Sequence, residues 1–214
     1  MTSIKMDIYS QSDSLMDPRL LLHACCGPCA EYPARTLLAE GFELRGYFFN
    51  PNIHPQAEHD RRRDNLLALA AQLNFPVDVD EAYDEETWRS MEAPERCRMC
   101  YTVRLEAAAR HASEIGFPRF TTTLLISPYQ DHEALKEIGE AAARAHGVEF
   151  FYRDFRPHFR EGQQQAREDG LYRQKYCGCI RSLEESPFRD KIMKDLSNVS
   201  GPSAEPPVSD TDRK

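Results

Sequence analysis

The sequence contains no long apolar run and no excess of positive charge. None of its apolar stretches reaches the roughly 18 to 20 residues that a membrane-spanning helix requires, so we expect no membrane span. The first 20 residues lack the charged and then apolar pattern of a secretory signal, and we therefore expect a cytoplasmic protein. The formal net charge of −8 at pH 7 argues against non-specific binding of nucleic acid.

The length of 214 residues suffices for one fairly large domain that buries its core without disulfides. We expect a single α/β domain over residues 18–196, preceded by an N-terminal extension over residues 1–17. The tail, residues 197–214, is rich in Pro and Ser and lacks a burial pattern, which predicts disorder.

Predicted strands and helices alternate about five times along the chain. The last two strands are expected at 119–127 and 148–155, and a single final helix at about 179–196. This alternation predicts an α/β fold, a parallel sheet with helices on both faces. Ligands of such sheets bind outside the carboxyl ends of the strands. The segments expected there are "CCGPC", "NPNIHP", "EAYDEE", "SPYQDHE" and "RDFRPHF".

The seven cysteines fall into three tight groups, "CCGPC", "CRMC" and "CGC". Packing thiols scatter along an element, and a reducing compartment disfavours disulfides. Cys97 and Cys100 lie one turn apart at a helix start, where free N–H groups favour thiolates. Cys25 and Cys26 lie on a loop and can supply two more sulfurs. Four thiolates suffice for a zinc ion or for a [4Fe–4S] cluster.

Three thiols remain: Cys29, Cys177 and Cys179. A structural zinc site closes with four ligands and has no use for them, whereas a redox site does. A disulfide between Cys177 and Cys179 would close a very small, strained ring, which is typical of a labile redox pair. These features favour iron–sulfur chemistry over zinc, and the residues alone leave zinc open.

Four motifs in order, "HACCGPC", "ERCRMCYTVRL", "TTTLLISPYQDHE" and "FRPHFREGQQQAREDGLYRQKYCGC", resemble the QueH family of epoxyqueuosine reductases over about residues 18 to 188. The resemblance implies reduction of the epoxide of epoxyqueuosine to queuosine at the wobble base of tRNA. It also implies a fold similar to adenine-nucleotide α-hydrolase or PP-loop (Rossmann-like) proteins, and an electron donor that the sequence does not identify.

The resemblance further implies roles for individual cysteines. Cys177 and Cys179 would form a redox-active pair, and Cys29 would be a ligand of a second, mononuclear iron. The ligands implied for a [4Fe–4S] cluster are Cys25, Cys26, Cys97 and Cys100.

Reduction of an epoxide to an alkene removes the oxygen atom and needs two electrons and two protons, so proton donors are required. The candidates are Asp131 and His132, with Tyr101 and His23 behind them. Each also has an ordinary interpretation: Asp131 and His132 as a helix cap, Tyr101 as core, and His23 as a partner of the backbone.

A tRNA substrate requires contacts to phosphates and to an unstacked base. Residues 153–181 carry a charge of +3 against −11 for the rest of the chain. This segment mixes Arg with aromatic residues, which suits phosphate contact and base stacking, although a solvated helix surface has the same charge pattern. The aromatic residues are Phe155, Phe159, Tyr172 and Tyr176.

Two other functions fit parts of the pattern. A PP-loop-type tRNA sulfur-transfer enzyme would use paired cysteines, but it needs a Ser/Gly-rich phosphate loop where this chain has "CCGPCA". A zinc-stabilised RNA-binding module without catalytic activity would use all the cysteines as structural ligands.

Overall fold

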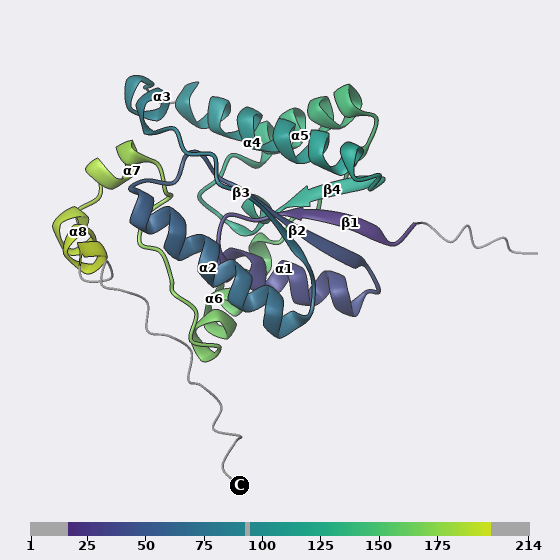
Figure 1. Ribbon diagram of the computed structural model, residues 1–214, viewed down its shortest axis with the longest axis horizontal. Helices are drawn as coiled ribbons and strands as arrows, with labels where there is room; N and C mark the ends of the chain where they lie inside the picture. The colour runs from purple at the N-terminus through teal and green to yellow at the C-terminus, as the bar shows by residue number, and fades with distance from the viewer. Residues whose placement is uncertain (1–16, 93–94, 198–214) are drawn as a thin grey trace, which may run out of the picture.

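The computed structural model describes residues 17–92 and 95–197 and contains a five-stranded parallel sheet between two layers of helices (Figure 1). The strand order is β3-β2-β1-β4-β5, and every pairing is parallel. The predicted α/β class is therefore confirmed. The strands are β1 (Arg19–His23), β2 (Glu43–Phe49), β3 (Val77–Asp80), β4 (Arg119–Thr122) and β5 (Glu149–Phe150).

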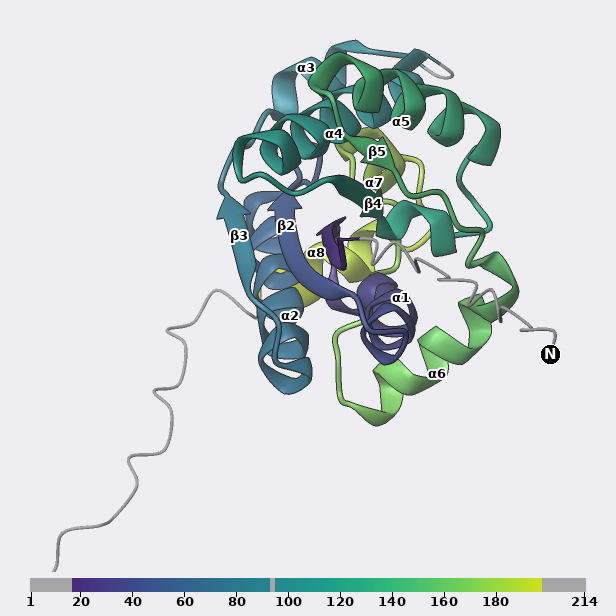
Figure 2. The same ribbon diagram turned by 90° about the vertical axis from the view of Figure 1, so that its right-hand side faces the viewer.

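The helices form two layers and one group beyond the sheet. Helices α1 (Gly27–Ala39), α2 (Gln56–Leu73) and α6 (Phe159–Glu168) pack together on one face of the sheet. Helices α4 (Glu95–Glu114) and α5 (His132–His146) pack against each other on the opposite face (Figure 2). Beyond the carboxyl ends of the strands, on the left of Figure 1, lie α3 (Glu85–Ser90), α7 (Ile180–Glu184) and α8 (Arg189–Ser197). None of the helices within the described ranges is long and apolar enough to cross a bilayer.

Strand β1 is the centre of the sheet and of the core. Leu20, Leu21 and Leu22 are fully buried because helices cover both faces of this strand. Helix α1 leads from β1 to β2 on one side, and the chain later crosses to β4 on the other side. The topological switch point therefore lies between the carboxyl ends of β1 and β4, which is where doubly wound sheets bind ligands.

Three predicted elements differ from the structure. Strand β4 ends at Thr122, whose Oγ1 accepts the N–H of Leu124 and begins a 3₁₀ helix, η1 (Thr123–Ile126). Strand β5 is only two residues long, and the predicted final helix is two helices, α7 and α8. The break comes at Pro187, because proline lacks an N–H and restricts the residue before it.

Two further segments bear on the predictions. Helix α6 and a short 3₁₀ helix before it, η2 (Arg156–His158), lie between the last predicted strand and the predicted final helix, where the sequence analysis expected no helix. The predicted N-terminal extension and disordered tail fall outside the described residues, apart from residues 17 and 197.

Candidate active site

Three buried sulfurs lie together where β1 gives way to α1. The Sγ atoms of Cys25, Cys26 and Cys29 are all within 4.8 Å of one another, and those of Cys25 and Cys26 are 3.7 Å apart. Cys26 is the N-cap of α1 and Cys29 lies in its first turn, so the helix start brings the three side chains together. Gly27 is required here, because a Cβ at this position would lie 2.8 Å from the carbonyl oxygen of Asn65. We call Cys25, Cys26 and Cys29 the sulfur trio.

The switch point fixes Cys25 between two strands. Its backbone N–H donates to Oγ1 of Thr123, the first residue after β4, over 3.3 Å. Hydrogen bonds from Cys26 and Cys29, together with the nearby positive charges of Arg104 and Arg62, lower the pKa of Cys25 well below its usual value. Burial raises the pKa of Cys26. The sulfur trio therefore favours one thiolate that its two thiol neighbours stabilise.

The donor set of the sulfur trio fits a soft metal. Four sulfurs at 2.3 Å from a tetrahedral metal lie about 3.8 Å apart, close to the separation of Cys25 and Cys26. An all-sulfur set suits zinc or an iron–sulfur group, and it does not suit magnesium or calcium.

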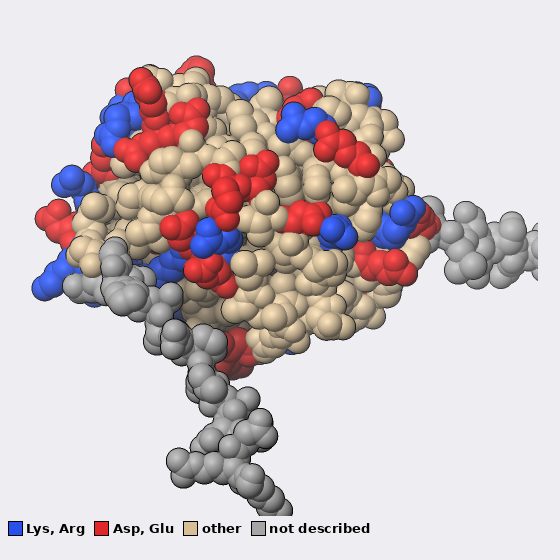
Figure 3. All heavy atoms as spheres, viewed as in Figure 1, with Lys and Arg blue, Asp and Glu red and all other residues tan. Residues whose placement is uncertain are grey.

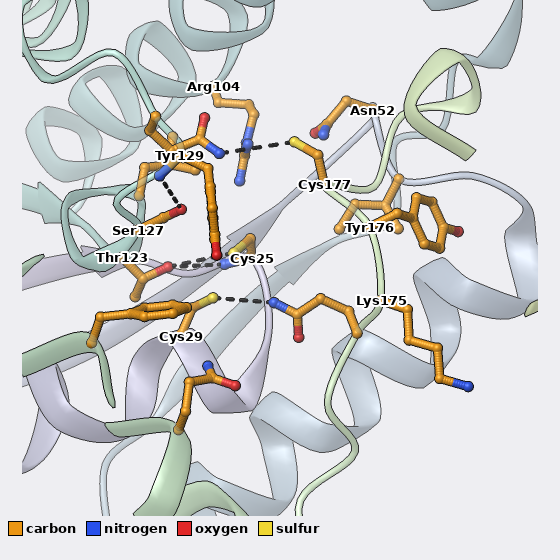
Figure 4. A pocket seen from close by; sticks show the side chains of 16 residues that line it. Cys25, Cys29, Asn52, Arg104, Thr123, Ser127, Tyr129, Lys175, Tyr176 and Cys177 are labelled. Carbon is orange, nitrogen blue, oxygen red and sulfur yellow. Dashed lines mark hydrogen bonds between the residues drawn. The ribbon is translucent and has the colours of Figure 1, made fainter. Parts of the chain in front are cut away.

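A cavity of about 370 Å³ opens above the sulfur trio (Figure 4). Its wall combines sulfurs, amides, one guanidinium and three aromatic rings from elements far apart in the sequence. Gln174 donates from Nε2 to the sulfur of Cys29 over 3.2 Å, as Figure 4 shows. The residues relevant to its chemistry are Cys25, Cys29, Asn52, Arg104, Thr123, Tyr129, Gln130, Phe159, Gln174, Tyr176 and Cys177.

The two cysteines of the predicted redox pair differ in exposure. Cys177 is exposed and lines the cavity, whereas Cys179 is buried at the start of α7, and both are free thiols. Gly178 between them has a φ of +133°, which a residue with a side chain rarely adopts. Loss of hydration, followed by the nearby charges of Cys100 and Cys179, raises the pKa of Cys177 to about 12. Cys177 therefore carries its proton at neutral pH.

The backbone around the predicted redox pair is held by α2 and by the turn before it. Arg62, buried on α2, donates from Nη2 to the carbonyl oxygen of Tyr176 over 3.1 Å. The backbone N–H of His54 donates to the carbonyl oxygen of Gly178 (2.8 Å). The ring Nδ1 of His54 accepts the backbone N–H of Ile180 (3.0 Å). The "NPNIHP" segment thus positions the cysteine loop.

The structure places Cys97 and Cys100 at the start of α4, outside the sulfur trio. Cys97 is exposed, and Cys100 is buried with its sulfur 3.8 Å from Nη1 of Arg104. Burial raises the pKa of Cys100, and the charge of Cys179 adds to that effect. Cys29, for which we predicted a separate iron, lies in one group with Cys25 and Cys26.

Two predicted proton donors do not line the cavity. Asp131 caps α5, and its Oδ1 accepts the N–H of Ala134 over 3.0 Å, as the ordinary interpretation of this residue proposed. His132 is buried with Nδ1 3.3 Å from the hydroxyl of Tyr152. Burial, reinforced by the positive charge of Arg156, lowers the pKa of His132.

Tyr101 reaches the cavity through a neighbour. Its buried hydroxyl donates to Oε1 of Gln130 over 2.8 Å and accepts the N–H of Asp131 over 3.3 Å. Gln130 in turn directs Nε2 toward the sulfur of Cys177, 3.9 Å away (Figure 4). Burial raises the pKa of Tyr101 to about 12. Gln130 therefore connects two residues whose roles we predicted from the sequence.

His23 lies in the core beneath the switch point. Its Nδ1 is 2.8 Å from Oγ1 of Thr122 and its Nε2 is 3.3 Å from the carbonyl oxygen of Phe49. The carbonyl can only accept, so Nε2 carries the hydrogen and Nδ1 accepts from the threonine hydroxyl. Burial lowers the pKa of His23 to about 3.

The aromatic residues of 153–181 differ in their access to a nucleobase. Phe155 is 1% exposed and lies in the core, so the stacking predicted for this ring is wrong, whereas Tyr176, at 9% exposure, lines the cavity. Tyr172 is partly buried with its hydroxyl bound to a buried carboxylate, while Phe159 lines the cavity. The exposed ring at the cavity is Tyr129, at 83% exposure, and it lies edge-on to Phe159 at 6.0 Å.

The positive charge of residues 153–181 is partly neutralised by neighbouring carboxylates. Arg153 pairs with Glu40 at 2.8 Å and Arg156 with Asp154 at 2.6 Å. Figure 3 shows acidic and basic side chains interspersed over the face in view, with no continuous basic surface. Three arginines of the segment make no ion pair with any described residue: Arg160, Arg167 and Arg173.

The polar cavity residues that the sequence analysis did not single out include Arg104, Gln130 and Gln174. A signal existed for Arg104, which follows Cys97 and Cys100 at helical spacing and so shares their face of α4. Gln130 and Gln174 lie within two of the four motifs given above, but an amide side chain does not by itself indicate a catalytic or metal-binding role.

Comparison with known proteins gives consistent results. The family described as "Epoxyqueuosine reductase QueH" matches residues 20–185 of this chain. A relative of that name from Dehalococcoides mccartyi is 36% identical over 173 residues, covering 79% of this chain and 95% of the relative. Another from Haemophilus influenzae is 37% identical over 180 residues, covering 78% of this chain and 73% of the relative. A third, from Acinetobacter baylyi, is 36% identical over 207 residues, covering 88% of this chain and 92% of the relative.

Solved structures give a more distant likeness. An NH3-dependent NAD synthetase from Campylobacter jejuni is similar with a TM-score of 0.41 and 13% sequence identity, covering 88% of this chain and 81% of that chain. This likeness says nothing of activity.

Proposed function

Because this chain belongs to the epoxyqueuosine reductase QueH family, we propose that the cavity above the sulfur trio is where it reduces the epoxide of epoxyqueuosine in tRNA to the alkene of queuosine. The observation that carries the proposal is the convergence of Cys25, Cys29 and Cys177 on one cavity at the switch point of the sheet. A structural zinc module does not account for thiols that line an open cavity, and a sulfur-transfer enzyme of the PP-loop type needs a phosphate-binding loop where this chain has "CCGPCA".

We infer that Cys25 and Cys26 of the sulfur trio, with Cys97 and Cys100, bind a [4Fe–4S] cluster, and that Cys29 is a ligand of a second, mononuclear iron. The close sulfur spacing, the burial of the trio and the all-sulfur donor set support this assignment. When bound, a [4Fe–4S] cluster supplies single electrons, and an additional mononuclear iron would act as a Lewis acid. The resemblance that suggested a separate iron for Cys29 leaves the division of ligands to experiment.

The predicted redox pair holds both the electrons and the protons that the reaction consumes. Converting the epoxide to an alkene and water consumes two electrons and two protons. Oxidation of the thiols of Cys177 and Cys179 to a disulfide releases two electrons and two protons. The raised pKa of Cys177 keeps a proton on its sulfur at neutral pH, facing the cavity. An external reductant, whose identity is open, then returns the pair to dithiol.

Two features at the rim of the cavity support an RNA substrate. A wobble base must leave its stack to reach the sulfurs, and the exposed ring of Tyr129 offers a surface for it. Arg173, which makes no ion pair with any described residue, directly precedes Gln174 of the cavity wall and is a candidate phosphate contact. The reaction belongs to the cytoplasm, where tRNA is modified.

An anaerobic turnover assay tests the proposal. Purified protein, tRNA carrying epoxyqueuosine and a chemical reductant are combined, and queuosine is measured by mass spectrometry of the digested RNA. We expect conversion by the wild-type protein and loss of conversion after Cys25→Ser or Cys97→Ser. Iron content and visible absorbance distinguish an iron–sulfur protein from a colourless zinc protein. A wild-type protein that contains its metal and converts nothing would contradict the proposal.

A further inference from the structure

Arg104 is a buried cation at the floor of the cavity. It lies on α4 one turn after Cys100, is only 2% exposed and forms part of the cavity wall (Figure 4). Nη2 donates to Oδ1 of Asn50 over 2.8 Å, and Nη1 lies 3.8 Å from the sulfur of Cys100. Its Nε has no hydrogen-bond partner.

Arg104 differs from the other buried arginines in the described part of the chain. Arg62 pairs with a carboxylate at 2.7 Å, Arg96 at 3.5 Å and Arg119 at 3.9 Å. Arg104 forms no ion pair with any carboxylate of the described residues; its neutral partner is Asn50. A guanidinium does not lose its proton in a protein, so its charge must be compensated in another way.

The sulfur of Cys100 lies 3.8 Å from Nη1 of Arg104, and Cys25 lines the same cavity as Arg104. Cysteines that bind a metal are deprotonated, so these two sulfurs then supply the negative charge that no carboxylate of the described residues offers to Arg104. A buried charge left uncompensated strongly destabilises a fold, and sulfur is therefore the partner available to this guanidinium.

We propose that Arg104 is the fixed counter-cation of the sulfur site, where it stabilises the more negative, electron-rich state of whatever metal group the cysteines bind. Adding one electron to a thiolate-bound metal group makes it more negative by one charge. A cation held at fixed distance in a site of low dielectric constant stabilises that state more than the oxidised one. The same charge favours thiolate over thiol and therefore strengthens metal binding. The inference rests on the metal-binding role of the cysteines that we propose above.

Cobalt affinity tests the proposal without turnover. Metal-free, reduced protein is titrated anaerobically with Co²⁺, and binding is followed by the sulfur-to-cobalt absorbance. We expect Arg104→Met to raise the dissociation constant at least tenfold, with Arg104→Lys within threefold of wild type. Arg104→Gln is a second neutral variant that retains a donor for Asn50. Arg119→Met removes a buried arginine at the opposite end of the sheet and should bind cobalt like wild type.

A redox titration of the iron-loaded protein is the second measurement. Arg104→Met should lower the ratio of reduced to oxidised centre at a fixed potential at least tenfold, which is about 59 mV for a one-electron couple. Arg104→Lys should retain the wild-type ratio. Equal cobalt affinity and equal potential in wild type and both neutral variants would overturn the role of Arg104 alone. A wild-type protein that binds neither cobalt nor iron would overturn the metal role of the cysteines, and this inference with it.

Discussion

Arg62 donates from Nη1 to the carbonyl oxygen of Cys177 over 3.0 Å, although the two residues are 115 positions apart. The guanidinium is 1% exposed and also pairs with Glu58 at 2.7 Å. A Cβ at residue 178 would lie 3.0 Å from the same Nη1, which explains the glycine in "CGC". The buried ion pair of Arg62 and Glu58 therefore helps His54 to fix the loop that carries the predicted redox pair.

Arg62→Met should destabilise the protein strongly. It leaves the carboxylate of Glu58 buried without a partner, which typically costs about 3–5 kcal/mol. Urea denaturation of the metal-free, reduced protein measures the loss in free energy of unfolding. The double variant Arg62→Met/Glu58→Gln should regain part of it, because no buried charge remains.

Arg63→Met is the matched control for that prediction. Arg63 lies on the same helix, but its partner Glu81 is 56% exposed, so the pair is screened by solvent. We expect a loss below about 1 kcal/mol. Equal losses from the two arginine variants would refute the buried pair as the element that holds the loop.

The sequence predicted those parts of the protein that depend on local pattern. Strand exits, helix caps and the grouping of cysteines follow from short motifs, and the structure confirms the parallel sheet and the proximity of Cys25 to Cys29. Hydrogen-bond partners that are far apart in the sequence were not predictable, because no local pattern indicates that Arg62 on α2 donates to the carbonyl oxygen of Cys177. The burial of Phe155 likewise depends on tertiary packing, which overrides the polar context around it.

Gln130→Leu should slow epoxide reduction, because it removes the amide that holds the sulfur of Cys177 in position. The amide contacts the sulfur at 3.9 Å and is itself held by the hydroxyl of Tyr101 at 2.8 Å. We expect about a tenfold fall in the single-turnover rate, with metal content and free energy of unfolding near wild type. Tyr101→Phe should have a smaller effect in the same direction.

A double-mutant cycle decides whether these two residues act together. Because Tyr101 acts through Gln130, the double variant should be no slower than Gln130→Leu alone. Additive effects on the rate would show instead that Tyr101 acts on the reaction independently, for example as a proton donor.

Tyr129→Ala should weaken binding of the RNA. Stacking of a base on an aromatic ring contributes about 1–3 kcal/mol, so we expect a rise in Kd of about tenfold for an anticodon stem–loop. Fluorescence anisotropy with metal-free protein measures this without turnover, and Tyr129→Phe should retain wild-type affinity. Phe188, 57% exposed and outside the cavity wall, provides the control Phe188→Ala, which should bind normally. An unchanged Kd for Tyr129→Ala would exclude the ring as a stacking surface.

His23 should make the protein sensitive to acid. Its pKa is about 3 in the folded state because it is buried, and near 6.5 in the unfolded chain, so the unfolded state takes up the proton first as the pH falls. The contribution of His23 to stability is therefore complete above pH 6.5 and declines between pH 6.5 and 3. At pH 5 this loss is about 2 kcal/mol. Urea denaturation of metal-free protein at pH 8 and pH 5 should show that His23→Gln loses about 2 kcal/mol less than wild type, whereas the exposed His158→Gln follows wild type. Parallel losses in all three proteins would mean that His23 binds its proton as readily in the folded core as in the unfolded chain, which its contacts to Thr122 and Phe49 argue against.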